Sequence, residues 1–147
     1  MTDAHGLTRL EPALALIGRL LLAYIFITSG WSKIATYAAT SQTMEAQGVP
    51  SALLPLVICV EIGGGLAVAF GLLSRLAGLG MAAFAIATAV LFHLVPSDQA
   101  QMINFNKNLA IAGGFLLLAA FGPGAWSIDA CWRHARSRAR PTPAQEK

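Results

Sequence analysis

One carboxylate, Glu61, lies within an otherwise uncharged apolar run, residues 57–73, that is long enough to cross a bilayer. A charged side chain at the bilayer centre costs roughly 2.5–3.5 kcal/mol on insertion scales, so such residues usually face the protein interior, where a partner can be supplied. A carboxyl group in that position is suited to exchanging a proton or accepting a hydrogen bond. We therefore predict that Glu61 is the catalytic residue.

Other polar side chains border the apolar runs and are predicted to bind a substrate beside Glu61. They are Arg19, Lys33, His93, Lys107 and Asn108. All but Arg19 fall at ends of apolar runs that are expected to face the same leaflet, so they would line one mouth above Glu61 and bind an anionic or carbonyl-bearing headgroup. One Glu, one His and two Lys residues make a poor ligand set for a metal ion, and we predict no metal site.

Two interpretations of Arg19 stay open. At 1.5 Å per residue, Arg19 lies about 9 Å from one membrane boundary and Glu61 about 12 Å from the other, so their depths differ by about 9 Å in a core of about 30 Å. An ion pair would be worth about 4 kcal/mol at an effective dielectric constant near 20. Keeping a glutamic acid neutral at pH 7 costs a similar amount, about 3.7 kcal/mol. These energies are too close to choose between a permanent ion pair and a protonatable Glu61. Arg19 itself either pairs with Glu61 or extends towards the headgroups.

Composition identifies the elements that must position these residues. Of the 147 residues, 56% are hydrophobic and only 12% are charged, which excludes an ordinary soluble domain and indicates an integral membrane protein. Four membrane spans are predicted, at about residues 13–32, 53–73, 76–95 and 107–126. A spacing of three and four residues between 34 and 50 predicts a short helix at the membrane interface between spans one and two.

The distribution of basic residues predicts the orientation. Lys and Arg are concentrated in residues 1–12, at the turn between spans two and three, and in residues 131–147, while the opposite side has only Lys33 and Lys107. By the positive-inside rule both termini are cytoplasmic. We therefore predict an all-α four-helix bundle, N-in and C-in, with a polar N-terminal segment (1–12), a membrane domain (13–130) and a basic disordered tail (131–147). The formal charge of +3 then reflects contact with a lipid bilayer, and no nucleic-acid partner is expected.

The order of several short motifs resembles the DoxX family of small bacterial inner-membrane proteins. The matching residues are Gly18-Arg19, Ser29-Gly30-Trp31-Ser32-Lys33, Gly48-Val49-Pro50, Glu61-Ile62-Gly63-Gly64-Gly65, Gly71, Arg75, His93, Lys107-Asn108, Gly122-Pro123-Gly124 and Ser127-Ile128-Asp129. The resemblance implies a four-helix bundle in the inner membrane. It also implies a link to redox physiology, because relatives are described as subunits of thiosulfate:quinone oxidoreductases, partners of thiol and superoxide defence enzymes, or quinone-resistance proteins.

The leading hypothesis is a membrane component of a quinone-linked or thiol-linked redox system, with a polar pocket around Glu61. The sequence contains no motif for a bound cofactor; a quinone is the candidate, and electrons would come from a protein partner or from the substrate. Two alternatives come from other classes. One is a carrier for a small solute or a proton, which would need to form a homo-oligomer, and the other is a non-catalytic structural or assembly subunit of a membrane complex.

Overall fold

The computed structural model describes residues 4–138, with side chains from residue 10 onward, and this part of the chain is helical without any β-strand. The elements are α1 (Ala4–Ala35), α2 (Tyr37–Ala46), the 3-10 turn η1 (Ser51–Leu53), α3 (Leu54–Phe70), α4 (Ser74–Thr88), the π-helical turn η2 (Ala89–His93), α5 (Gln99–Phe121) and α6 (Ile128–Arg138). Four segments are long and apolar enough to cross a membrane: Leu10–Ala35, Ser51–Phe70, Ser74–His93 and Gln99–Phe121. The predicted all-α membrane fold, with a short helix between spans one and two, is confirmed.

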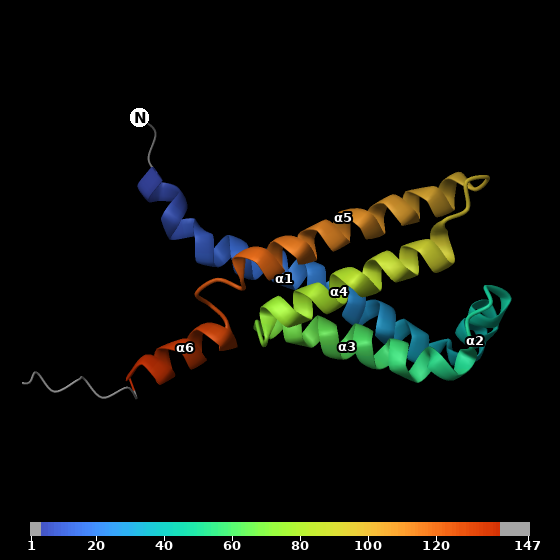
Figure 1. The fold of residues 1–147 in the computed structure, drawn as a ribbon, viewed down its shortest axis with the longest axis horizontal. Coiled ribbons are helices and arrows are strands. Elements are labelled where there is room, and N and C mark those ends of the chain that lie inside the picture. The colour runs from blue at the N-terminus through green and yellow to red at the C-terminus, as the bar shows by residue number, and fades with distance from the viewer. Residues whose placement is uncertain (1–3, 139–147) are drawn as a thin grey trace, which may run out of the picture.

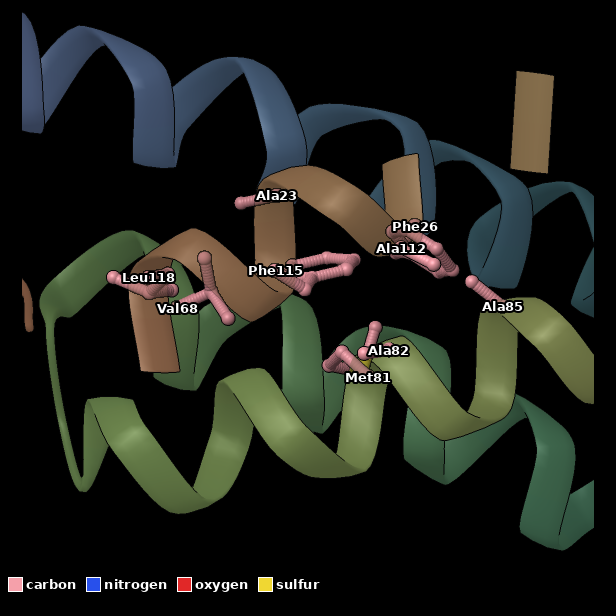
Figure 2. Packing of buried hydrophobic residues seen from close by; sticks show 9 residues of the cluster. All are labelled: Ala23, Phe26, Val68, Met81, Ala82, Ala85, Ala112, Phe115 and Leu118. Atoms are coloured by element: carbon pink, nitrogen blue, oxygen red, sulfur yellow. The ribbon is translucent and has the colours of Figure 1, made fainter. Parts of the chain in front are cut away.

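The four long helices pack as two pairs. α1 lies mainly against α3, and α4 lies mainly against α5 (Figure 1). Residues from all four helices meet in one apolar cluster, where Phe115 of α5 is fully buried and contacts Phe26 of α1 with ring centroids 5.4 Å apart (Figure 2). Alanines such as Ala82 and Ala85 of α4 occupy the same cluster and let the helices approach closely.

The outer surface of the bundle is as apolar as its interior. Large exposed side chains include Leu21 and Tyr24 of α1, Leu56 and Phe70 of α3, and Leu117 of α5. In the most apolar window of each span, only 17% to 28% of the residues are buried inside the protein. A contiguous apolar exterior of this extent has no counterpart in soluble monomers, and it suits contact with lipid chains.

The fourth span begins earlier than the sequence predicted. The fourth span was predicted to begin at about residue 107, but α5 already starts at Gln99. The reason is a helix cap: the carboxylate of Asp98 accepts hydrogen bonds from the backbone N–H groups of Ala100 and Gln101, at 2.8 and 3.2 Å. The same helix ends at Gly122, before the predicted boundary at residue 126.

The two ends of the chain are also more helical than predicted. α1 begins at Ala4, so Pro12 lies inside it instead of in its first turn, and much of the expected polar segment 1–12 is helical. The expected disordered tail 131–147 is helical up to Arg138 as part of α6, and its remainder, 139–147, lies outside the described residues. The start of α1 and α6 lie at the same end of the bundle (Figure 1). The assignment of that end to the cytoplasm stays a prediction.

Candidate functional site

A polar cavity of about 500 Å³ lies at the end of the bundle that carries α2. Its walls come from α1, α2, α3, α5 and the end of α4 with its π-helical turn η2. The polar residues that line it are Ser29, Lys33, Thr40, Thr43, Gln47, Glu61, Thr88, His93, Gln101, Asn104, Lys107 and Asn108. Five of the six predicted site residues therefore border one cavity, although they come from four different helical elements.

Glu61 is the buried charge of this cavity, with only 5% of the residue exposed. Its Oε1 atom accepts a hydrogen bond from Lys33 Nζ at 2.9 Å and another from Ser29 Oγ at 3.1 Å. Lys33 Nζ also donates to Ser29 Oγ at 2.7 Å, which closes a three-membered network. The cation that balances Glu61 is thus Lys33.

The sequence of α1 places this network by simple helical spacing. Ser29 and Lys33 are four residues apart, so their side chains lie on the same face of α1, one turn apart. Between them, Gly30 lets α3 approach: a Cβ atom at this position would lie 3.2 Å from Glu61 Cβ and 2.7 Å from Ile62 Cγ1. The missing side chain of Gly30 therefore brings the carboxylate of α3 within reach of both donors.

The second carboxylate oxygen of Glu61 is not satisfied by the protein. Oε2 is buried and has no hydrogen-bond donor among the described residues. A buried carboxylate oxygen without a partner is costly, by about 1–3 kcal/mol or more for a charged group. That cost is relieved by a donor on a bound molecule or by a proton on Oε2. Oε1 is therefore held by Lys33 and Ser29, whereas Oε2 stays without a donor among the described residues.

The opposite wall of the cavity is built by η2 and the first turns of α5. His93 ends the π-helical turn, and its Nδ1 atom lies 2.8 Å from Gln101 Oε1. Asn108 Nδ2 donates to the backbone carbonyl of Asn104 at 3.2 Å, and Lys107 makes no ion pair within the described part of the chain. π-Helical turns are rare and often occur at functional sites. Lys107, His93 and Gln101 thus line the same cavity as Glu61, and His93 and Gln101 are bonded to each other.

Arg19 does not belong to this cavity. It lies 14 residues before Lys33 on α1, a separation of about 21 Å along the helix. Only 3% of Arg19 is exposed, and its Nη2 atom donates to the backbone carbonyl of Trp126, two residues before α6. The proposed pairing with Glu61 is therefore wrong, and so is extension to the headgroups. The similar estimated depths of Arg19 and Glu61 in the membrane suggested the pair. The position of Arg19 on α1, far from Lys33 and from the Glu61 network, prevents it.

Arg19 instead takes part in the docking of α6. Asp129 accepts hydrogen bonds from the backbone N–H groups of Leu73 and Ser74, both at 2.8 Å, and its own N–H donates to the carbonyl of Gly71 at 3.0 Å. Burial raises the pKa of Asp129, but the hydrogen bonds from Ser74 and Leu73 and the charge of Arg133 outweigh it and hold the pKa below its ordinary value of 3.8. The ionised carboxylate thus caps α4 from another helix.

A model of the DoxX family matches residues 14–94. The chain belongs to the DoxX family. It is 53% identical over 121 residues to the inner membrane protein YqjF of Escherichia coli (strain K12), covering 82% of this chain and 93% of that protein. It is 37% identical over 126 residues to the inner membrane protein YphA of the same organism, covering 81% of this chain and 90% of that protein. No solved structure matches the chain.

The DoxX match contains both partners of the buried ion pair and His93, but it ends before Lys107 and Asn108. The cavity is therefore only partly built from the segment that the family model covers. α5, which supplies the remaining wall, lies wholly outside that segment.

Several polar residues of the site were not predicted from the sequence of this DoxX protein, among them Ser29, Gln101, Thr40 and Thr43. Ser29 was quoted only as part of a motif, although its position one helical turn before Lys33 already indicated a shared face. Gln101 was assigned to a loop, and no signal in the apolar pattern marks it as a partner of His93. Thr40 and Thr43 of α2 also line the cavity. They lie in the predicted interfacial helix, but no local sequence pattern indicates that this helix borders a cavity.

Proposed function

We propose that this DoxX protein is the membrane component of a quinone-linked redox system in the bacterial inner membrane, and that its cavity holds a quinone headgroup beside Glu61. The observation that carries the proposal is the buried, unpartnered Oε2 atom of Glu61 next to a cavity of about 500 Å³. That volume falls within the range of small-molecule sites, about 300–1,000 Å³. The inner-membrane location is supported by the two relatives, which are both inner membrane proteins.

The lining of the cavity supports a ring that bears polar oxygens. Phe26 and Phe92 supply aromatic faces, and Ile25, Val57 and Ile111 supply aliphatic ones. The lining also includes hydrogen-bonding groups from different helices, the Glu61 network of α1 and α3 and Lys107 of α5. A quinone has two carbonyl oxygens on opposite sides of a flat ring, and each can accept a hydrogen bond from one of these groups.

The proposed chemistry balances if a protein partner supplies a dithiol. Oxidation of two thiols to a disulfide releases two electrons and two protons, and a quinone takes up two electrons and two protons to become a quinol. In its protonated form Glu61 gives the proton on Oε2 to a carbonyl oxygen of the ring as that oxygen gains electron density. The resulting carboxylate is stabilised by Lys33 and Ser29, and it regains one of the two protons released when the dithiol is oxidised to the disulfide, while the other proton goes to the second carbonyl oxygen of the ring.

The experiment compares Glu61→Gln with Glu11→Gln, an exposed position on α1 outside the cavity. The full chain is purified in a mild detergent, and binding of a short-tailed benzoquinone is measured by equilibrium dialysis. Glu61→Gln should weaken binding about tenfold or more, because it removes the acid and alters the hydrogen bonds of a desolvated site. Glu11→Gln should bind like the wild type. Equal binding by all three proteins would remove Glu61 from the site.

The same preparations separate the two alternatives. A carrier for a small solute or proton moves its cargo in proteoliposomes without a partner, and Glu61→Gln stops that movement. A structural subunit tolerates replacement of both members of the ion pair, Lys33→Met with Glu61→Gln, as many buried pairs do. If mass spectrometry of the purified protein finds bound phospholipid but no quinone, the proposed ligand is wrong.

A further inference from the structure

We propose that a second cavity, between the α3–α4 turn and α6, binds the phosphate of an anionic phospholipid. This cavity has a volume of about 390 Å³ and shares no lining residue with the cavity around Glu61. Its basic lining residues are Arg75 at the start of α4 and Arg133 and Arg136 on α6. The two cavities therefore differ in place and in chemistry, so this proposal stands independently of the quinone proposal.

The charge of the second cavity favours an anion. Three guanidinium groups line it, and none of them makes an ion pair within the described residues. The single acid of the lining, Asp129, already directs both carboxylate oxygens to backbone N–H groups. Guanidinium groups bind phosphate oxygens through paired, charge-assisted hydrogen bonds. Three arginines without an ion pair, on two elements, therefore fit a phosphate group. A carboxylate-bearing peptide fits less well, because the cavity would also have to supply hydrogen-bonding partners for the peptide backbone.

The apolar part of the lining favours a lipid over a soluble phosphate. Leu73, Leu76 and Trp132 line the same cavity and are 57%, 68% and 51% exposed. The cavity lies at the turn between two candidate membrane spans, and the ends of membrane spans meet the headgroup region of a bilayer. Tryptophan is enriched at that level, where arginines attract anionic headgroups. A diacylglycerol phosphate presents both the charge and the apolar surface that this lining complements.

The walls of the cavity are held in place before any ligand binds. α6 is fixed to the α3–α4 turn by three hydrogen bonds of Asp129. The backbone carbonyl of Trp126, just before α6, accepts a hydrogen bond from Arg19. Figure 1 shows α6 projecting from the end of the bundle, away from the four packed helices, so that one side of it stays free. A preorganised site loses less entropy on binding.

The test uses the full chain in a neutral detergent and native mass spectrometry with added phosphatidylglycerol or phosphatidylcholine. Phosphatidylglycerol adducts should exceed phosphatidylcholine adducts, and Arg133→Gln or Arg75→Gln should each lower apparent affinity for phosphatidylglycerol about tenfold. Because these arginines lie on different elements and are exposed, loss of folding in one variant leaves the other as the test. The matched control is Arg138→Gln, which removes the same charge from α6 outside the cavity.

Three results would overturn the proposal. If Arg138→Gln lowered the affinity for phosphatidylglycerol as much as Arg133→Gln does, the basic helix would attract acidic lipid in general and not at this cavity. Equal adducts of both lipids would mean that the headgroup charge is not recognised. Thermal stabilisation by inorganic phosphate alone that matches stabilisation by phosphatidylglycerol, and that Arg133→Gln removes, would assign the cavity to a soluble phosphate compound.

Discussion

The ion pair between Lys33 and Glu61 allows a direct test of the site. Lys33 Nζ lies 2.9 Å from Glu61 Oε1, and it is the cation that is bonded to this carboxylate in the described part of the chain. Replacing Lys33 by Met leaves a buried carboxylate supported by Ser29 alone. Replacing both residues, Lys33→Met with Glu61→Gln, removes both charges. The single Lys33→Met variant should therefore be less stable than the double variant, although it carries fewer substitutions.

The magnitude follows from the burial of the two partners. Removing one member of a fully buried pair typically costs about 3–5 kcal/mol. Here 6% of the Glu61 side chain is exposed but 26% of the Lys33 side chain is, so water screens part of the interaction. We therefore expect Lys33→Met to cost about 2–3 kcal/mol and the double variant about 1 kcal/mol. The coupling energy between the two positions should be about 2 kcal/mol.

The assay is a double-mutant cycle on the free energy of unfolding, measured by reversible denaturation in mixed micelles. A second cycle with Lys107→Met and Glu61→Gln serves as the control, because Lys107 lines the same cavity without an ion pair to Glu61. Its coupling energy should stay below about 0.5 kcal/mol. If the Lys33 cycle gives no more coupling than the Lys107 cycle, the network around Glu61 does not hold the buried charge.

Three further predictions concern the packing that positions the two cavities. Asp129→Asn should lower stability by about 1–2 kcal/mol, because it weakens the acceptors for two backbone N–H groups. Since the pKa of Asp129 is lowered, its stabilising effect is full above the ordinary value of 3.8 and is lost as the pH falls through the lowered value, so the melting temperatures of the wild type and of Asp129→Asn should converge once the pH is below that lowered pKa. Gly71→Ala should cost about 2 kcal/mol, since φ is +66° and a Cβ would meet a buried guanidinium, whereas Gly63→Ala, with open space around it, should be nearly neutral in thermal unfolding. Gly30→Ala should cost about 1–3 kcal/mol and weaken benzoquinone binding by pushing α3 away, whereas Gly18→Ala should change neither measurement.

The membrane architecture was predictable because lipid imposes simple rules. Every backbone group must be satisfied within the bilayer, so apolar runs of sufficient length are helices. The helix ends were less predictable, since they depend on individual side chains. Asp98 caps α5 and extends it into a stretch that reads as a polar loop, and no hydropathy pattern indicates that. The helical segment of α6 was taken for a disordered tail because its arginines dominate the composition.

The candidate site was predictable in depth but not in direction around the helices. Lys33, His93 and Lys107 stand at span ends that face one leaflet, and the structure does bring them to one cavity. Arg19 was assigned to the same group because its estimated depth approached that of Glu61. The side of α1 on which a residue points relative to α3 depends on how the helices pack, and that information is spread over many apolar contacts. Ser29, by contrast, follows from its spacing to Lys33 on one helix.

The two buried charges of the spans lead to a criterion that hydropathy cannot provide. Arg19 and Glu61 are almost equally buried, and each has polar atoms without a hydrogen-bond partner in the described residues, Nε and Nη1 in one case and Oε2 in the other. Arg19 borders neither cavity and is enclosed by the chain at Gly71 and Ser127, whereas Glu61 borders a cavity with basic and amide groups on its far wall. An unsatisfied polar atom that is surrounded only by protein takes part in packing and nothing else. One that borders a cavity can bind a ligand or transfer a proton. The space beside the charge, more than the charge itself, therefore distinguishes Glu61, which borders a cavity, from Arg19, which bonds the backbone that leads into α6.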